Sequence, residues 1–305
     1  MKQRVKIGID LGGTKIAVVA LSPSNQTLFS NRLPTPKGNY QGVLETIHDL
    51  VNQAKKNTGA DGEDNVSIGI GIPGSVSPQT NLIQNANSTW MNTKPFQSDI
   101  ERTLDQSVKL ANDANCLALS ESFDGAAKGA GTVFGVIIGT GCGGGLIVNG
   151  KLIEGRHAIC GEWGHTPLPW LKADEFPGPP CWCRQNGCIE TWVSGTGMEQ
   201  AYQRTFGQVF TAQNIVDRAS DGNKDAQACL DLHADRLARG LALITNLYDP
   251  DVIVLGGGLS NMSHLYEQLP FLMKKYVFAD AFDANIKKPV HGDASGVRGA
   301  ARLWD

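Results

Sequence analysis

The chain has 305 residues, of which 41% are hydrophobic and 19% charged, and its formal net charge is −3. This composition excludes a disordered chain, the length suits two domains, and the weakly acidic charge argues against nucleic acid as the main partner. We expect neither a membrane span nor a signal peptide, and therefore a soluble cytoplasmic protein.

The first half of the chain opens with a predicted β-hairpin. A short apolar run ends at Asp10, a glycine turn follows, and a second apolar run returns from Ile16. Apolar residues at helical spacing then predict a helix, and two β-branched runs predict buried strands. In chain order the predicted elements are strands at 6–10 and 16–21, a helix over 43–54, strands at 66–72 and 108–111, and a helix over 116–127.

The second half repeats this opening, which predicts a structural repeat of a hairpin with glycine and threonine at its tip. Asn149-Gly150 then predicts a type I′ turn, and Pro250 is expected to end a long amphipathic helix. The tail from Ser295 predicts a helix with a small-residue face. The other predicted elements are strands at 133–138, 146–148 and 151–153, a helix over 230–248 and a strand at 252–255.

The 36 glycines gather where short strands end. The stretches 69–74 and 139–144 match G-x-G-x-x-G, but neither leads into a helix, so a Rossmann dinucleotide site is rejected. The P-loop pattern G-x-x-x-x-G-K-[ST] does not occur. Two hairpin tips can instead hold a triphosphate through backbone N–H groups, with Asp10 near Mg²⁺. A pair of ordinary tight hairpins is the alternative.

Three segments resemble the nucleotide-binding motifs of the superfamily of sugar kinases, Hsp70 and actin: 10–15, 139–144 and 256–258. Within it the whole chain is similar to the ROK family, and most to its bacterial fructokinases. The resemblance implies an α/β, two-domain, actin-like ATPase fold of the ribonuclease H type, with ATP and Mg²⁺ as cofactors and a homodimer as the assembly. The implied nucleotide-binding residues are Gly8, Ile9, Asp10, Leu11, Gly12, Gly13, Thr14, Lys15, Gly139, Thr140, Gly141, Cys142, Gly143, Gly144, Gly256, Gly257 and Gly258.

We place the boundary between the two domains near residue 120. Residues 1–119 would form a smaller N-terminal α/β domain, which the final segment 293–305 would rejoin. Residues 120–292 would form a larger α/β domain that carries a cysteine-rich loop. In such an arrangement the closure of two domains over a substrate would exclude water from the reaction.

That loop carries the strongest local signal. Seven cysteines without an export signal indicate reduced thiols or metal ligands rather than disulfides. Cys181, Cys183 and Cys188 lie within eight residues, and His165 precedes the first of them by sixteen. Three thiolates and one imidazole match a closed, structural, tetrahedral Zn²⁺ site. Three unrelated cysteines are the alternative.

The resemblance selects His165 over His157 as the fourth ligand, because the segment 162–165 resembles the ligand-bearing segment of the family. One position departs from the family pattern: Arg184 stands where glycine is usual, which is expected to alter the turn but not the ligand set. The remaining cysteines are expected to be ordinary small residues, and a nucleophilic role for Cys142 is disfavoured.

Asp113 lies between a predicted strand end and a predicted helix start. A carboxylate there could take the proton of an acceptor hydroxyl as it attacks a γ-phosphate, a role worth about 10² to 10⁴ in rate. The alternative is a helix N-cap, which aspartate commonly provides. The resemblance of Asn112-Asp113 to the family's catalytic pair favours the general base.

Glu162 and Glu190 flank the cysteine loop. Carboxylates can bind the vicinal hydroxyls of a sugar, so we expect the metal to position both of them, and His165, over the acceptor. His165 would bind the metal through one ring nitrogen and face the sugar with the other. The resemblance implies a sugar site made of Gly74, Asn87, Asn112, Asp113, Glu162, His165 and Glu190.

The predicted function is therefore an ATP-dependent hexose kinase. Within this class, the preferred prediction is a fructokinase that makes fructose 6-phosphate. The choice of fructose rests only on segments 85–90 and 167–170, which resemble the fructokinase branch. Glucose, mannose and N-acetylglucosamine are the alternative acceptors. A repressor of the same family is disfavoured, because the first phosphate motif starts at Gly8 and leaves no room for a helix-turn-helix. A chaperone or actin-like ATPase would not need the cysteine cluster.

Overall fold

The computed structural model describes residues 4–60, 62 and 65–305. The expectation of no signal peptide rests on residues 1–10, of which Met1–Gln3 lie outside the described residues. Within the described ranges, no helix combines the length and the apolar character that a membrane crossing requires.

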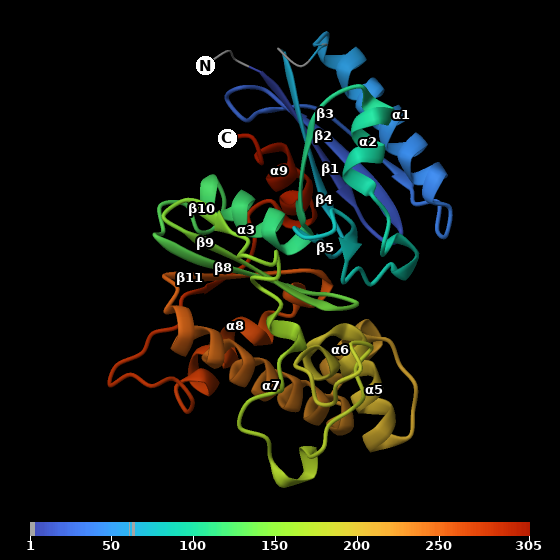
Figure 1. Ribbon diagram of the computed structural model, residues 1–305. Coiled ribbons are helices and arrows are strands. Elements are labelled where there is room, and N and C mark those ends of the chain that lie inside the picture. Colours follow the sequence, from blue (N-terminus) through green and yellow to red (C-terminus); the bar gives the residue numbers. More distant parts are fainter. Residues whose placement is uncertain (1–3, 61, 63–64) are drawn as a thin grey trace.

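Two five-stranded sheets form the frame of the protein (Figure 1). The first contains β1 (Val5–Leu11), β2 (Lys15–Leu21), β3 (Thr27–Pro34), β4 (Val66–Ile72) and β7 (Val108–Asn112); the second contains β8 (Thr132–Ile138), β9 (Cys142–Val148), β10 (Lys151–Ile153), β11 (Val252–Gly256) and β12 (Ile286–Lys287). The strand orders are β3-β2-β1-β4-β7 and β10-β9-β8-β11-β12. In each sheet a central strand pairs antiparallel with its hairpin partner and parallel with the next strand, so the predicted repeat is confirmed.

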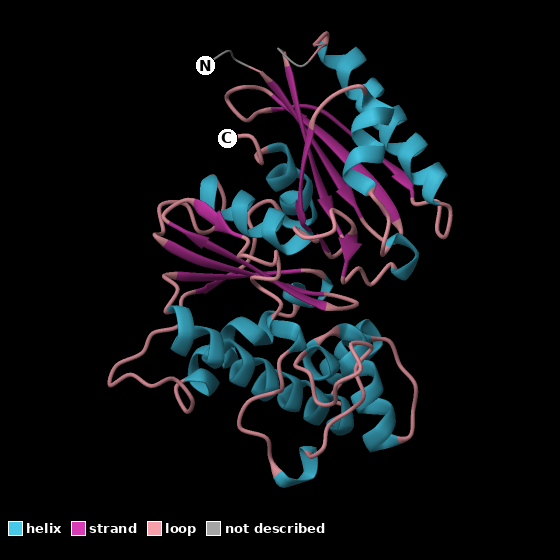
Figure 2. Cartoon of the chain, viewed as in Figure 1, coloured by secondary structure: helices cyan, strands magenta, loops and turns pink. Residues whose placement is uncertain are grey.

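Helices cover the outer face of each sheet and fill the space between the sheets (Figure 2). The helices are α1 (Tyr40–Thr58), α2 (Phe96–Leu104), α3 (Asp113–Phe123), α4 (Glu190–Val193), α5 (Gly195–Phe206), α6 (Ala212–Ser220), α7 (Lys224–Tyr248), α8 (Ser263–Met273) and α9 (Ser295–Ala301). α1 and α2 pack on the outer face of the first sheet, α7 and α8 on that of the second, and α3 and α9 lie between the sheets. The shorter elements are the hairpin β5 (Ser75–Val76) and β6 (Ile83–Gln84), and 3₁₀ turns at Thr89–Met91, Trp163–His165, Ala173–Glu175, Gly258–Asn261 and Gly292–Ala294.

The two long helices bury the faces that their apolar spacing predicts. The predicted face of α1 is fully buried from Val43 to Ala54. α7 buries its predicted face as far as Ile244 and ends before Pro250, as expected. Tyr248, the last residue of the helix, packs on this core too: its ring stacks on Phe134 with centroids 6.4 Å apart, although its side chain is 44% exposed.

Glycine allows α9 to lie directly on the first sheet and on α3. A Cβ at Gly8 would lie 2.0 Å from the carbonyl oxygen of Val297, and one at Gly69 would lie 2.0 Å from that of Ala300. On the other side, a Cβ at Gly299 would lie 1.8 Å from the carbonyl oxygen of Cys116. The predicted small-residue face of the last helix is therefore confirmed, and the backbone contact explains it.

The structure differs from the sequence prediction in several elements. The glycine turn predicted at 139–144 is shorter, because Cys142 to Gly144 already pair with β8 as part of β9. The helix predicted over 116–127 starts at Asp113 and ends at Phe123. The sequence analysis did not predict β3, α2, α5, α6, α8 or β12. The division into two domains near residue 120 stays a proposal; that position lies in α3, between the two sheets.

Candidate active site

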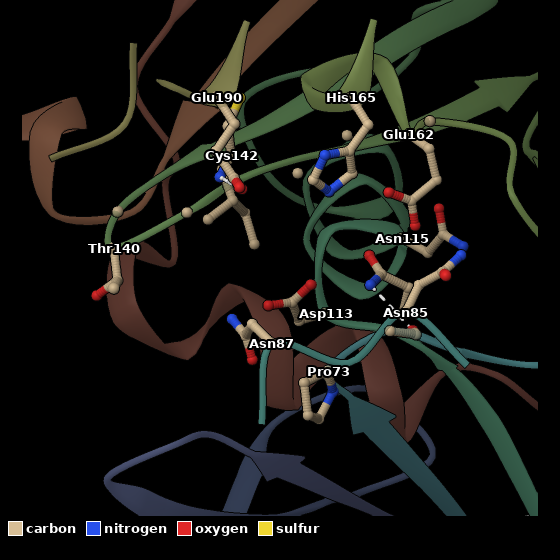
Figure 3. A pocket seen from close by; sticks show the side chains of 18 of the residues that line it. Pro73, Asn85, Asn87, Asp113, Asn115, Thr140, Cys142, Glu162, His165 and Glu190 are labelled. Carbon is tan, nitrogen blue, oxygen red and sulfur yellow. Dashed lines mark hydrogen bonds between the residues drawn. The ribbon is translucent and has the colours of Figure 1, made fainter. Parts of the chain in front are cut away.

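Two cavities meet at Asp113, which lines both of them. The first has a volume of about 250 Å³ and the second of about 340 Å³, and both take residues from the two halves of the chain. Besides Asp113 the cavities share Pro73, Asn87 and Ile137. Figure 3 shows the first cavity, with Asp113, Asn87 and Pro73 on one side and Glu190, His165 and Glu162 on the other.

The N-terminus of α3 fixes Asp113. Asn112 is the N-cap: its Oδ1 accepts a hydrogen bond from the Ala114 N–H at 2.9 Å, and its Nδ2 donates to the Gly74 carbonyl at 3.1 Å. Asp113 is therefore the first helical residue and not the cap. Burial raises the pKa of Asp113 above its ordinary value. A carboxylate with a raised pKa at the junction of two cavities is suited to accept a proton.

Gly74 supports this arrangement through its backbone. Its φ of 72° lies in the left-handed region, and a Cβ there would lie 2.3 Å from the carbonyl oxygen of Gln84. No other residue type fits this turn. The carbonyl that holds Asn112 is thus placed by a position that only glycine can occupy.

Asp10, at the end of β1, lines the second cavity. Burial first, and then the negative charge of Asp113, raise the pKa of Asp10 to about 7, while Lys15 opposes the shift. Two carboxylates whose charges destabilise each other form a donor set that a divalent cation would stabilise, and carboxylate oxygens are the ligands that Mg²⁺ prefers. The residues present therefore fit Mg²⁺.

The second cavity gathers part of the predicted nucleotide site. Lys15 and Lys288 both line it and supply positive charge for phosphates. Lys288 was missed by the sequence analysis, because an isolated lysine before a proline carries no motif. Of the predicted nucleotide-binding residues, six line this cavity: Asp10, Leu11, Gly12, Gly13, Lys15 and Gly257. Lining residues that were not predicted are Ser260, Asn261, Gly292, Asp293 and Gly296.

Five predicted nucleotide residues do not line either cavity. Gly8 makes room for α9, and the side chain of Ile9 is fully buried in the first core. Gly256 serves packing too, because a Cβ there would lie 2.1 Å from the Leu117 side chain. Thr14 at the exposed hairpin tip and Gly258 are the other two.

The second glycine turn, residues 139–144, lines the first cavity rather than the second. The Cys142 N–H donates to Glu190 Oε2 at 2.9 Å, so the turn is joined to the carboxylate that follows the cysteine loop. The Cys142 thiol is buried, and burial raises its pKa well above the ordinary value. A thiol that stays protonated is a poor nucleophile, in agreement with the minor role expected for it.

The cysteine loop brings its four candidate ligands together. The ligand atoms of His165, Cys181, Cys183 and Cys188 all lie within 4.8 Å of one another. The Sγ atoms of Cys183 and Cys188 are 3.5 Å apart, and His165 Nδ1 is 3.6 Å from Cys181 Sγ. Tetrahedral Zn²⁺ with bonds of about 2.3 Å to sulfur sets neighbouring ligand atoms roughly 3.8 Å apart, so the residues fit zinc.

Arg184 shows how the loop departs from the usual pattern. Its φ is 73°, a left-handed conformation that glycine adopts freely and arginine only with strain. Its N–H donates to the Cys181 carbonyl at 2.9 Å, which closes the turn between the first two cysteines. The arginine therefore leaves the four candidate ligands together, as expected. The expected change of the turn is not seen: the turn is closed, at the cost of backbone strain.

Glu162, His165 and Glu190 all line the first cavity, together with Gly74, Asn87 and Asn112. Burial raises the pKa of Glu162, and the charges of Asp113 and Glu190 act in the same direction. The predicted sugar-site residues are therefore brought together around one cavity. A cluster of carboxylates and amides can bind several hydroxyl groups, each of which is both donor and acceptor.

Eight residues that line the first cavity were not predicted as site residues: Pro73, Asn85, Asn115, Ile137, Ala158, Cys160, Gly161 and Trp182. Asn115 follows Asp113 by two residues and Trp182 lies between two cysteines, so both could have been found as neighbours of predicted residues. Two of the residues that suggested fructose lie elsewhere. Pro167 forms a bridge with Cys188, and the Trp170 ring packs on Tyr276 with ring centroids 5.0 Å apart.

Comparisons with known proteins agree with this geometry. The family model described as the ROK family matches residues 6–305. The chain is 39% identical over 302 residues to an N-acetyl-D-glucosamine kinase of Haemophilus influenzae (strain 86-028NP), covering 97% of this chain and 98% of that protein. It superimposes on a crystal structure of a ROK hexokinase from Thermus thermophilus with a TM-score of 0.85 at 29% identity, covering 97% and 96% of the two chains. A ROK family glucokinase from Streptomyces griseus, in complex with glucose and AMPPNP, gives a TM-score of 0.77 at 26% identity, with 98% of each chain covered.

Proposed function

Because the chain belongs to the ROK family, with the actin-like ATPase fold, and is an ATP-dependent hexose kinase, we propose that its acceptor is N-acetyl-D-glucosamine, phosphorylated on the C6 hydroxyl. The observation that carries the proposed transfer is the position of Asp113, a residue that lines both cavities. The acceptor would occupy the first cavity and the phosphates of ATP the second.

In this arrangement Asp113 is the general base. As the C6 hydroxyl oxygen attacks the γ-phosphorus, the hydroxyl proton passes to the Asp113 carboxylate, the bond from the γ-phosphorus to the bridging oxygen breaks, and ADP leaves. Lys15 and Lys288 would bind the phosphate oxygens. Asp10 would hold Mg²⁺, which neutralises phosphate charge when it is bound.

The acceptor would be held by groups that match sugar hydroxyls. Glu162 and Glu190 accept hydrogen bonds, and the amides of Asn87 and Asn112 can both donate and accept. We further propose that zinc, bound by His165 and the three cysteines, keeps the loop between Glu162 and Glu190 in place. His165 Nδ1 faces the cysteines, which leaves Nε2 for the acceptor.

The relatives support N-acetylglucosamine, one of the alternatives left open by the sequence, over fructose. The expectation of fructose rested on two segments. Trp170 in one of them packs on Tyr276 and does not line the cavity, so that segment carries no information on the acceptor. Asn85 and Asn87 in the other do line the cavity, but an amide binds the hydroxyls of either sugar.

An ADP-release assay coupled to a second enzyme tests the proposal. The purified protein should turn over N-acetylglucosamine with a kcat/KM at least 10-fold above those for glucose, mannose and fructose. An acceptor-free reaction and the Asp113→Asn variant serve as controls for background ATP hydrolysis. A higher kcat/KM for fructose than for N-acetylglucosamine would restore the fructokinase interpretation and overturn this one.

A further inference from the structure

We infer that Trp182 determines acceptor specificity: its indole N–H positions Glu190, and its ring forms the wall that contacts the 2-acetamido group of the sugar. The inference rests on the proposed function, because it assigns a residue to the substituent that separates N-acetylglucosamine from glucose.

The first observation is the hydrogen bond of the indole. Trp182 Nε1 donates to Glu190 Oε1 at 2.8 Å, while the Cys142 N–H donates to Glu190 Oε2 at 2.9 Å. Both carboxylate oxygens are thus fixed by protein donors before any sugar enters. Each oxygen keeps a free lone pair, so Glu190 can still accept a sugar hydroxyl, now in one orientation.

The second observation is the position of the ring. Trp182 packs edge-on against His165, with ring centroids 4.8 Å apart and planes at 89°, and yet its side chain is 49% exposed. Its two neighbours along the chain are candidate metal ligands, so a bound metal would fix the backbone that carries the ring. A large apolar surface is thereby held at the opening of a polar cavity.

Trp182 is also the only tryptophan, tyrosine or phenylalanine among the described residues that line the first cavity. The other lining residues are polar, charged or small, apart from Pro73 and Ile137 at the border with the second cavity. An aromatic ring can pack on the C–H face of any hexose. An acetamido substituent adds a methyl group, whose burial against the ring removes further apolar surface from water.

The shape of a pyranose ring places that substituent on the side of Trp182. Ring atoms C2 and C5 are opposite each other, and C6 is attached to C5. When the C6 hydroxyl approaches Asp113, C2 points to the far side of the cavity. Figure 3 shows Glu190 and His165 on that far side, and Trp182 contacts both of them.

Two substitutions separate the two roles of Trp182. Trp182→Phe keeps an aromatic ring and removes the N–H, so it should raise the acceptor KM about 3- to 10-fold for N-acetylglucosamine and glucose alike. Trp182→Ala removes both and should in addition lower the ratio of kcat/KM for N-acetylglucosamine to that for glucose by about 10-fold or more. The KM for ATP should stay within about 2-fold of wild type in both variants.

Trp170→Phe is the matched control, because Trp170 is 46% exposed, packs on Tyr276 and does not line either cavity. It should behave as wild type. The metal content and melting temperature of each variant show whether the loop is intact. If Trp182→Ala loses metal, the proposal is decided by Trp182→Phe, whose acceptor KM must rise while its metal content stays unchanged.

The outcomes distinguish the inference from the function on which it rests. A wild-type enzyme that prefers N-acetylglucosamine, combined with a Trp182→Ala variant that keeps its metal and the full preference over glucose, overturns the acetamido contact alone. Unchanged acceptor KM in Trp182→Phe overturns the positioning role. A wild-type enzyme that phosphorylates glucose but not N-acetylglucosamine overturns the proposed function, and the acetamido contact with it.

Discussion

The two glycine turns of the repeated hairpins are alike in backbone but differ in what surrounds them. The first, between β1 and β2, carries its own charges, Asp10 and Lys15, and lines the second cavity. The second, between β8 and β9, has no charged residue and lines the first cavity, where it holds Glu190 from another part of the chain. A repeated fold thus provides two equivalent turns, and the side chains around each turn decide which ligand it can bind.

The neighbours of the two turns are held in different ways. The first turn belongs to a lobe whose core is packed by α1 and closed by α9. The neighbour of the second turn is the cysteine loop, which has an exposed tryptophan at its tip and three thiols and an imidazole inside. Changes near the first turn should therefore affect the nucleotide, and changes near the second turn or its metal site should affect the acceptor.

The largest effect on activity is expected at Asp113, where the two cavities meet. Asp113→Asn should lower kcat at least about 100-fold and leave acceptor binding nearly intact, because the amide keeps the shape but cannot take the proton. Since the pKa of Asp113 is raised, wild-type kcat/KM should fall on the acid side at a pH above the ordinary carboxyl range. Product-formation assays at several pH values measure kcat and kcat/KM, and calorimetric titration with the sugar measures acceptor binding. Turnover within a few-fold of wild type would exclude Asp113 as the base.

Removal of the metal should affect only the side of the second turn. We expect about one zinc per chain by metal analysis. A chelator should weaken acceptor binding by about 10-fold or more, because the loop next to Glu190 loses its support, and should leave the affinity for a non-hydrolysable ATP analogue unchanged. Added zinc should reverse the loss. A fully active preparation without zinc would contradict the structural role.

One substitution on each side tests the comparison directly. Lys15→Met should raise the KM for ATP about 10-fold and the acceptor KM little, because a phosphate contact is lost. Glu190→Gln should do the opposite, because one carboxylate oxygen becomes a donor that faces the Trp182 or Cys142 N–H. Steady-state kinetics with both substrates varied give all four values. If both variants shift the same KM, the two turns do not serve separate ligands.

In the absence of a bound cation, Asp10→Asn should increase the stability of the fold at neutral and alkaline pH, because the Asp10 carboxylate is buried beside the first turn. The folded-state pKa of Asp10 is raised to about 7, so its ionisation weakens the fold as pH rises from about 4 to 7. The variant should therefore match wild type in stability near pH 4 and exceed it near pH 8, on the order of 4 kcal/mol without ligands. Denaturant unfolding at the two pH values measures this. Equal stability at pH 8 would mean that the carboxylate is already compensated.

The smallest effect is expected at Arg184. Glycine there would remove the strain of a left-handed arginine, a gain of about 1 kcal/mol that is partly offset by the greater freedom of glycine in the unfolded chain. Arg184→Ala is the matched control, since it loses the same charge and keeps the strain. A gain in melting temperature for the glycine variant alone supports this explanation; an equal gain for both would assign the effect to charge.

The sequence predicted the frame of the fold because the frame depends on local patterns. Val66–Ile72 and Lys151–Ile153 are strands at the predicted bounds, and α7 ends where Pro250 requires. β3 was not predicted, because a strand at the edge of a sheet that is mostly exposed shows little alternation of apolar and polar residues. Its residues from Thr27 to Pro34 are mostly exposed. Such a strand is held by its partner β2 rather than by its own composition.

The site was predicted where chemistry depends on residue type, and less well where it depends on the paths of distant segments. The four cysteine-loop ligands and the residues around Asp113 are brought together as the motifs suggested. The turn at 139–144 lines the first cavity, and Gly8 makes room for α9. Both facts follow from how the sheets and helices pack, and no local motif predicts that packing. Trp182 was not predicted, because it lies between two cysteines whose spacing indicates a metal site and not a contact with the acceptor.

The last helix has a consequence for the order in which the protein is made. β1 is translated long before α9, which packs on it through Gly8. At about 5–20 residues per second, the inner face of the first sheet stays uncovered for some tens of seconds. During synthesis the lobe that is started first is therefore completed last, and a nascent chain that stops before Ser295 lacks the segment that closes it.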